Sequence, residues 1–319
     1  MEKTKNNNQK TQKNKQENRI YIKKVIIILI LVLMIILLGI GIDCFLKQQN
    51  KIELIQTSPQ SQSQMMGYII KTKQGKVIAI DGGTKEDTEN FIKNINDLGG
   101  KIDIWFITHP HKDHAGVLNS VIEQNIDLKL GKIYYTANDL SWYLEYDPER
   151  AFEAEDFYKT ITNSKIKDKV EEVTLNQIIN IDNLEFEILG VKNPEITVNP
   201  FNNSSMIIKL KVNEKEVLFL ADTGAESGMK LLQNQEDKLK SDIVQMAHHG
   251  QAGVTKEVYE KINPKICLWP TPDWLWDNNP GTGYNTGPYK TIETRQWIES
   301  LGVKQNIVAK DGDIKLEIW

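Results

Sequence analysis

Apolar residues along this chain form one long run near the amino terminus and many short runs after it. Residues 25–38 are all Val, Ile, Leu or Met, and the apolar character continues to residue 42. A segment of this length can cross a bilayer core of about 30 Å as a helix. A cleaved signal peptide would have a shorter apolar region of about 7–15 residues, followed by a small-x-small site that this sequence lacks. We therefore predict a retained transmembrane anchor at residues 20–46, held in the lipid bilayer.

The short runs have the length and the residue types of strands. They lie at residues 52–55, 67–72, 76–81, 102–108, 132–135, 178–181, 184–189, 206–212, 217–220, 243–247 and 265–268. Residues 84–98 and 115–124 place apolar side chains at helical spacing, and residues 140–162 are polar and helix-prone. We therefore expect strands and helices from residue 47 to residue 319, with an exposed loop at residues 58–64.

Side chains that bind metal ions follow directly after the run at residues 102–108. His109, His111, Asp113 and His114 fall within six consecutive positions there. Residues two apart in an extended segment point the same way, so His109 and His111 can face one ion, while Asp113 and His114 can face a second. The chain has five histidines, and the other two are adjacent, at positions 248 and 249. This clustering predicts a centre of two divalent metal ions, for which imidazole and carboxylate suit zinc and also admit manganese or iron.

Two aspartates end other predicted strands. Asp222 follows residues 217–220, and one carboxylate can hold two ions about 3.5–4 Å apart. By itself it would be an ordinary loop residue, but three strand ends with ligand-type side chains indicate a single rim. Asp81 ends residues 76–81. It either orients a metal-binding histidine or forms an Asp-Gly turn.

Charge divides the chain as sharply as hydropathy does. Residues 1–18 contain no apolar residue after the initiator, so we predict a disordered tail at residues 1–19. Residues 1–24 carry seven lysines and one arginine against two glutamates, which places the tail in the cytoplasm and the domain outside the cell. That segment contributes +6 to a chain of net charge −4, so the remainder carries −10. An acidic domain disfavours nonspecific binding of nucleic acid. The two cysteines, Cys44 and Cys267, define no disulfide framework.

The motif His-x-His-x-Asp-His, the Asp-Thr-Gly step at residues 222–224 and the histidine pair resemble the metallo-β-lactamase-fold hydrolases. Within that superfamily the chain is most similar to the soluble domain of ComEC, the DNA-uptake channel protein, and to phosphorylcholine esterases. The resemblance runs from about residue 52 to residue 319 and implies an α/β fold, a four-layer αββα sandwich with a dinuclear site at one edge. It assigns His109 and His111 to one ion, Asp113, His114 and His248 to the other, and Asp222 as the bridge.

Some positions stay open. Either His248 or His249 can be the ligand, and the other would face the substrate, as a phosphate contact or a proton donor to the leaving group. We take Asp113 and His249 as catalytic candidates. Many family members have a further histidine before the bridging aspartate, where this chain has Asn-Asn-Ser-Ser-Met at residues 202–206. Water, Asn203 or the substrate could fill that ligand position.

An aromatic segment at residues 269–289 has two readings. Its rings either plug the edge of the core or form one wall of a substrate pocket, where they can hold a base, a sugar or a quaternary ammonium. The candidate substrate-binding residues are Asn203, Ser205, Trp274, Trp276 and Tyr284.

The reaction class expected from such a centre is hydrolysis, because a metal-bound water has a pKa of about 7 and supplies hydroxide at neutral pH. The resemblance favours a phosphodiester over a lactam or thioester. We therefore predict a membrane-anchored phosphodiesterase that acts on a cell-envelope or other extracellular phosphoester. The alternatives are a ComEC-like nuclease or accessory protein in DNA uptake, which with a single anchor would need a partner, and a metal-stabilised binding protein without activity.

Overall fold

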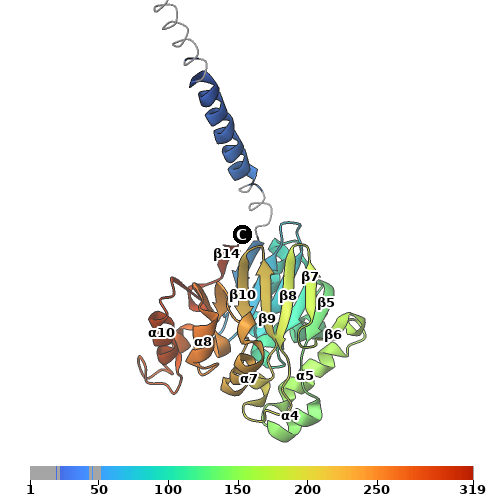
Figure 1. Cartoon of the computed structure of the whole chain (residues 1–319). Coiled ribbons are helices and arrows are strands. Elements are labelled where there is room, and N and C mark those ends of the chain that lie inside the picture. The colour runs from blue at the N-terminus through green and yellow to red at the C-terminus, as the bar shows by residue number, and fades with distance from the viewer. Residues whose placement is uncertain (1–18, 20–21, 43–44, 46–51, 319) are drawn as a thin grey trace, which may run out of the picture. The chain divides into compact units, whose positions relative to one another are not determined.

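The computed structural model describes residues 19, 22–42, 45 and 52–318 of the chain. The chain divides into two compact units, Met1–Gln49 and Asn50–Trp319. In the first unit, Ile22–Ile42 forms a helix whose length and apolar composition suffice to cross a membrane (Figure 1). The predicted tail lies outside the described residues apart from Arg19, and so does the predicted boundary between residues 46 and 47.

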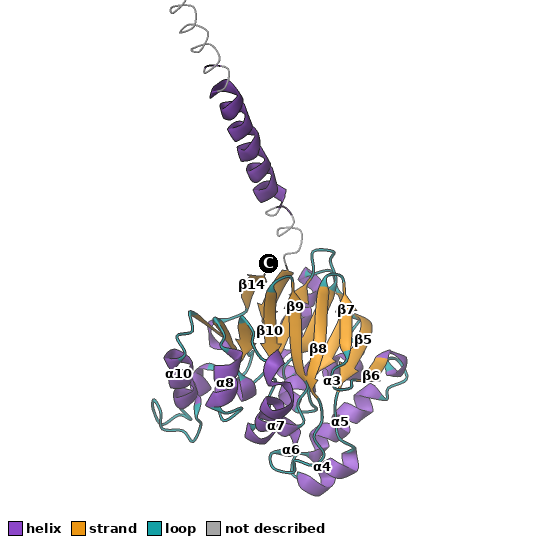
Figure 2. Ribbon diagram, viewed as in Figure 1, coloured by secondary structure: helices purple, strands orange, loops and turns teal. Residues whose placement is uncertain are grey.

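Two seven-stranded sheets form the centre of the second unit (Figure 2). The first sheet has the order β14 (Ile314–Ile318), β1 (Ile52–Gln56), β2 (Gly67–Lys71), β3 (Val77–Asp81), β4 (Lys101–Ile107), β5 (Lys129–Tyr135) and β6 (Val170–Glu172). The second sheet has the order β13 (Gln305–Val308), β12 (Ile266–Trp269), β11 (Ile243–Gln245), β10 (Lys215–Phe219), β9 (Ile207–Val212), β8 (Leu184–Gly190) and β7 (Ile178–Ile181). The last strand of the chain therefore returns to pair with the first strand of the domain.

Helices cover the outer face of each sheet. They are α2 (Thr88–Asp97), α3 (Lys112–Glu123), α4 (Leu140–Tyr146) and α5 (Ala151–Ile161) on the first sheet, and α7 (Ala225–Gln235), α8 (Lys256–Ile262) and α10 (Thr291–Ser300) on the second. The shorter elements are α6 (Pro200–Asn203), α9 (Asp273–Trp276) and the 3-10 turns η1 (Lys85–Asp87), η2 (Lys167–Lys169), η3 (Glu236–Lys238), η4 (Ala247–Gly250) and η5 (Ala309–Asp311). The predicted four-layer αββα sandwich is confirmed.

Strand β4 shows why the sequence forms this sandwich. Ile104 and Phe106 pack between the two sheets, whereas Trp105 and Ile107 pack under the helices of the first sheet. Successive side chains of a strand point to opposite faces, so a strand that is covered on both faces reads as a continuous apolar run. The two sheets meet through aromatic contacts such as Phe106 on Phe186, whose ring centroids lie 5.1 Å apart.

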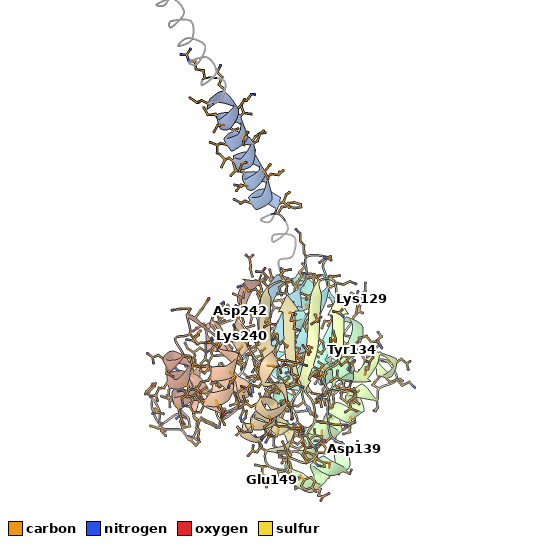
Figure 3. All side chains as sticks on the ribbon, viewed as in Figure 1. Lys129, Tyr134, Asp139, Glu149, Lys240 and Asp242 are labelled. Carbon is orange, nitrogen blue, oxygen red and sulfur yellow. The ribbon has the colours of Figure 1, made fainter. Side chains whose placement is uncertain are left out.

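Parallel pairing brings the ends of several strands to one edge. Strands β3, β4, β5 and β6 run parallel to one another, and so do β10, β11, β12 and β13. Figure 3 shows Lys129 and Asp242, at the beginnings of β5 and β11, toward one edge, and Asp139, beyond the end of β5, toward the other. At that second edge the backbone N–H of Met206 donates to the carbonyl oxygen of Thr108 at 2.8 Å and joins the two sheets.

The structure moves one predicted boundary that matters for the site. Helix α3 begins at Lys112 rather than Ala115, so Asp113 and His114 lie in its first turn. The backbone N–H of Lys112 is satisfied by the carboxylate of Glu153 at 2.7 Å, a contact from a distant helix that a local pattern does not reveal. The helix-prone region at residues 140–162 is likewise two helices, α4 and α5, separated by a turn that contains Pro148.

Candidate metal centre

Sharp turns follow the strands at this edge. Asp81, Ala221, His248 and His249 have φ between 49° and 55°, in the left-handed region. Residues other than glycine adopt it at a cost of order 1–3 kcal/mol each, and such strain gathers at functional sites. These turns redirect the chain as it leaves β3, β10 and β11, so that side chains of both sheets converge.

Gln245 holds one of these turns in place. Its fully buried side chain accepts a hydrogen bond from the backbone N–H of Ala221 at 2.7 Å and donates to the Ala221 carbonyl oxygen at 3.1 Å. The N–H of His248 donates to the same carbonyl at 2.9 Å. The end of β11 therefore fixes the residue that precedes Asp222.

Two groups of side chains at this edge are each close enough together to hold a metal ion. The four-residue group is Asp113, His114, Asp222 and His249, and the three-residue group is His109, His111 and Asp222. Asp222 belongs to both. Its Oδ1 lies 3.3 Å from Nε2 of His114, and its Oδ2 lies 3.5 Å from Nε2 of His249. This arrangement agrees with the expected role of Asp222 as a bridge between two ions.

The donor atoms themselves fit divalent cations. Among the described residues, the buried side-chain atoms that make no hydrogen bond of acceptable geometry include Nε2 of His111, Nε2 of His114, Nε2 of His249 and Oδ1 of Asp222. Nε2 of His114 and Nε2 of His249 nevertheless lie 3.1–3.5 Å from carboxylate oxygens of Asp113 and Asp222. Buried polar groups are nearly always paired, and each unpaired group needs an explanation. Imidazole nitrogens and carboxylate oxygens that point toward one another in this way are the ligands found in zinc, manganese and iron sites.

The structure separates the two adjacent histidines. His249 donates from Nδ1 to the carbonyl oxygen of Pro270 at 2.9 Å, which leaves Nε2 facing Asp113 at 3.1 Å. His248 has partners at both ring nitrogens, the Ala252 carbonyl oxygen at 3.3 Å and Nδ2 of Asn202 at 3.1 Å. It lies outside both groups. We therefore exchange the roles expected for the pair, with His249 as the ligand candidate and His248 beside the centre.

Two further side chains orient the histidines. Asp81 accepts from the N–H and the hydroxyl of Thr108 and lies 2.7 Å from Nδ1 of His114. Carboxylates in this position fix the tautomer and the orientation of a metal-binding histidine. Ser205, expected to bind substrate, has its hydroxyl 3.4 Å from Nδ1 of His109, and that hydroxyl accepts from the N–H of Asp222 at 3.3 Å.

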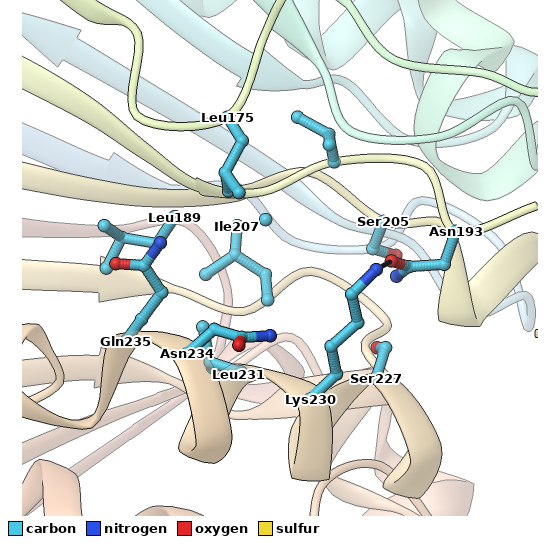
Figure 4. A pocket seen from close by; sticks show the side chains of 12 residues that line it. Leu175, Leu189, Asn193, Ser205, Ile207, Ser227, Lys230, Leu231, Asn234 and Gln235 are labelled. Carbon is cyan, nitrogen blue, oxygen red and sulfur yellow. Dashed lines mark hydrogen bonds between the residues drawn. The ribbon is translucent and has the colours of Figure 1, made fainter.

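Ser205 also lines a small cavity, which no member of the two metal groups lines. This cavity has a volume of about 50 Å³, and in it Lys230 points to Asn193 and donates to its Oδ1 at 2.6 Å (Figure 4). A cavity of that size holds a few water molecules and no larger ligand. Ser205 therefore contacts the metal groups through His109 and Asp222, and its predicted role in substrate binding stays a prediction.

Burial and the neighbouring carboxylates set the protonation of the site. Burial lowers the pKa of His109 and of His111 well below the usual histidine value. Burial would also lower the pKa of His114 and of His249. Several contributions that raise these pKa values outweigh it, and the largest of them is the negative charge of Asp222. The pKa of His114 is raised well above its usual value, and that of His249 rises to about 10. Metal ligands must be deprotonated, so a bound cation would take the place of these protons.

Asn203, the proposed replacement for the absent histidine, is fully engaged elsewhere. Its Oδ1 accepts from the N–H of Ser227 at 3.1 Å, and its Nδ2 donates to the Val198 carbonyl oxygen at 2.7 Å and to Glu226 at 2.9 Å. A Cβ atom at Gly224 would lie 2.6 Å from Asn203 Oδ1, which explains the glycine of the Asp-Thr-Gly step. Asn203 therefore holds the start of α7 against α6.

The aromatic segment builds a separate pocket. Trp276 and Tyr284 line a cavity of about 480 Å³ together with Trp269 and Arg295, and no member of the two metal groups lines it. Trp274 donates to the carbonyl oxygen of Gln62 at 2.8 Å and packs on Tyr289. The ring of Trp269 packs closely against Gly250, the residue after His249, because a Cβ atom at Gly250 would lie 2.4 Å from that ring. A substrate wall formed by Trp274, Trp276 and Tyr284 stays a prediction.

Comparison with known proteins places this site in a family. Residues 66–264, more than half of the chain, match the model of the metallo-beta-lactamase superfamily. The metallo-beta-lactamase fold protein YhfI from Bacillus subtilis is similar in structure, with 11% identity, a TM-score of 0.53 and coverage of 84% of this chain and 100% of that chain. CmlA, a diiron beta-hydroxylase from Streptomyces venezuelae, has 12% identity and a TM-score of 0.53, with coverage of 85% and 54%. At such identities the likeness shows the fold alone.

One curated relative is similar in sequence. ComE operon protein 3 of Bacillus subtilis (strain 168) is 24% identical over 169 residues, which cover 53% of this chain. The matched part is 20% of that protein, so this chain spans only a small share of its relative. The similarity supports the ComEC-like branch. With the αββα sandwich, the shared aspartate and the match over residues 66–264, the chain belongs to the metallo-beta-lactamase superfamily.

Proposed function

We propose that this chain is a membrane-anchored, metal-dependent phosphodiesterase whose catalytic domain lies outside the cell. The observation that carries the proposal is the pair of ligand groups that share Asp222, each with buried donor atoms that make no hydrogen bond within the described residues. Two bound divalent ions would supply a nucleophile at neutral pH and stabilise charge that develops on the attacked group. A binding protein without activity is the weaker alternative, because two adjoining groups exceed what one closed structural site requires.

The residues around the groups support an anionic substrate. Arg150 lies close enough to His111 for its positive charge to contribute to the low pKa of that ring, although burial contributes more. Glu153 fixes Arg150 there, with Oε1 3.2 Å from Nε, while its Oε2 accepts from the N–H of Lys112. The Lys112 side chain is exposed next to the ligand Asp113. Two cations at the rim suit a phosphate group.

A phosphodiester is favoured over a lactam or thioester by the similarity to the ComEC-like branch, although the activity of ComE operon protein 3 is not carried over to a chain that matches a fifth of it. The net charge of −10 after residue 24 disfavours a long nucleic acid. We therefore propose a cell-envelope or other extracellular phosphoester as substrate, and a ComEC-like nuclease or accessory role in DNA uptake as the second candidate.

The location outside the cell is proposed from the charges beside the apolar helix. Residues 1–24 carry an excess of lysine and arginine, and such segments stay in the cytoplasm. The helix Ile22–Ile42 would then cross the bilayer once.

A substrate panel tests the proposal. Purified protein is loaded with Zn²⁺ or Mn²⁺ and assayed on bis-p-nitrophenyl phosphate, p-nitrophenyl phosphorylcholine and single-stranded DNA, with Asp222→Ala as the inactive control. We expect turnover of the small phosphodiesters that depends on Asp222. Fast cleavage of DNA with slow turnover of both small substrates would favour the nuclease candidate. No hydrolysis of any substrate by the loaded wild type would refute the proposed reaction class.

The rim cations give a second readout in the same assay. Arg150→Ala should raise KM for bis-p-nitrophenyl phosphate more than it lowers kcat, because Arg150 acts on the charge of the substrate and not on the reacting atoms. Exposed Lys159, on the next helix, provides the matched control, and Lys159→Ala should leave both constants unchanged.

A further inference from the structure

One more buried atom beside the centre lacks a partner, and it belongs to a residue that the sequence did not single out. The side chain of Asn202 is 2% exposed, and its Oδ1 has no hydrogen-bond partner among the described residues. The same condition marks Nε2 of His111 and Oδ1 of Asp222, which belong to the ligand groups. An amide oxygen with no donor nearby is costly to bury unless a cation or a donor occupies the space in front of it.

The hydrogen bonds around Asn202 fix which atom of its amide is free. Nδ1 of His248 faces the Ala252 carbonyl oxygen at 3.3 Å, and a carbonyl can only accept, so Nδ1 carries the proton. Nε2 of the same ring then accepts, and the atom of Asn202 that faces it at 3.1 Å must be the donor Nδ2. The Oδ1 atom is therefore the end that points away from His248.

Position also connects Asn202 with the three-residue group. The preceding residue, Phe201, stacks on the ring of His111, with centroids 4.5 Å apart. On the other side, His248 Nε2 lies 4.0 Å from Oδ2 of Asp222. Helix α6 therefore contacts His111 through Phe201 and His248 through Asn202, beside the group that has one member fewer than its neighbour.

We infer that Oδ1 of Asn202 is a further ligand of the metal centre, serving the ion held by His109 and His111, and that His248 positions it. The inference rests on the two-metal centre of the proposed function. It gives this ion a neutral oxygen where many members of the superfamily have an imidazole. Carbonyl oxygens suit harder cations such as Mn²⁺ better than imidazole does, so this ion should exchange more readily than the one in the four-residue group.

Metal titration without substrate tests the inference. The full chain in detergent is stripped, reloaded with Zn²⁺ or Mn²⁺ and dialysed against a graded series of a chelator, and bound metal is measured by elemental analysis. We expect two ions per wild-type chain, and an affinity for the weaker ion that falls at least about tenfold in Asn202→Ala. Asn202→Asp, which keeps an oxygen at the same distance from the backbone, should retain both ions.

Asn119→Ala is the matched control. Asn119 lies further along α3, and its buried Oδ1 also has no hydrogen-bond partner within the described part of the chain. It belongs to neither ligand group, so its loss should leave both affinities unchanged. His248→Ala should weaken only the more exchangeable ion. Wild-type affinity for both ions in Asn202→Ala, or equal loss in Asn202→Asp and Asn202→Ala, would overturn the inference.

These outcomes stay separate from the fate of the proposed function. A wild-type chain that binds two ions but hydrolyses no phosphodiester refutes the function and leaves the ligand test readable. If Asn202→Ala does not fold, the Asn202→Asp variant decides, since retention of both ions supports the inference and loss of one overturns it.

Discussion

Nδ1 of His114 lies 2.7 Å from Oδ2 of Asp81, and both side chains are fully buried. The other ring nitrogen of His114 faces Asp222 at 3.3 Å. Asp81 therefore determines which nitrogen of His114 is presented to an ion. Asp81 is the last residue of β3, the strand that pairs with β4.

Loss of this contact should weaken metal binding. In Asp81→Asn the ring of His114 loses its fixed orientation, and we expect metal affinity to fall by about 10–100-fold. Chelator competition measures the change. Asp87→Asn is a suitable control, because Asp87 is 1% exposed and accepts hydrogen bonds from Thr84 and Gln60, but contacts no ligand group. An unchanged affinity in Asp81→Asn would show that His114 needs no such partner.

The two adjacent histidines should differ in their effect on metal content. His249→Ala removes a member of the four-residue group and should abolish tight binding of one ion, whereas His248→Ala keeps that group whole and should have a smaller effect. Elemental analysis of the two purified variants makes the comparison. The opposite order would return His248 to the ligand role that the family resemblance suggested.

Acid should weaken one set of hydrogen bonds that joins the two ends of the domain. Burial alone would raise the pKa of Asp313, but hydrogen bonds from Ser58, Asn94 and Asn90 outweigh it and hold the pKa below the usual value. A carboxyl group whose pKa is lower in the folded state than in the unfolded state stabilises the fold at pH values above the unfolded pKa of about 3.9. This stabilisation is lost as the pH falls through the folded pKa. The difference in free energy of unfolding between metal-free wild type and Asp313→Asn should therefore decrease from pH 6 to pH 3. Urea unfolding at each pH measures this difference. A gap independent of pH would contradict this.

Orientation in the membrane has its own test. Protease added to intact cells should remove the domain and spare a tag placed before residue 1, because the charges before residue 25 keep that end inside. A tag after residue 319 should disappear at the same rate as the domain. Full protection of the domain, together with loss of the amino-terminal tag, would reverse the topology and exclude extracellular substrates.

Local patterns were enough to predict most of the strands, but not β6, β13 or β14, nor the helices α7, α8 and α10 on the second sheet. The run at residues 102–108 predicted β4, and the runs at residues 67–72 and 76–81 predicted β2 and β3, each with bounds within one residue of the structure. These predictions use only residues that are close in sequence. The pairing of β14 with β1 joins residues 52 and 318, and no local pattern carries a contact of that separation.

The site shows the same division. Five histidines in two clusters predicted where the ligands lie, because strand ends expose consecutive side chains at one edge. Choosing between His248 and His249 required the left-handed turn at residues 248 and 249 and the partners of each ring nitrogen. Asn202 and Asn203 are neighbours of one type, and only their hydrogen bonds show which has a free oxygen. The sequence analysis therefore missed Asn202 as a ligand candidate. Its place in the segment before the bridging aspartate, where many family members have a histidine, was the signal that could have identified it.

The most direct test of the whole account is the metal content of the wild-type protein and of Asp222→Ala, because Asp222 is the one residue common to both ligand groups. Each protein is reloaded with Zn²⁺ or Mn²⁺, freed of excess metal and analysed for bound ions per chain, with circular dichroism to confirm the fold. The account predicts two ions in the wild type and loss of most of both in Asp222→Ala. Two ions retained by a folded Asp222→Ala variant would contradict the shared carboxylate and the centre built around it.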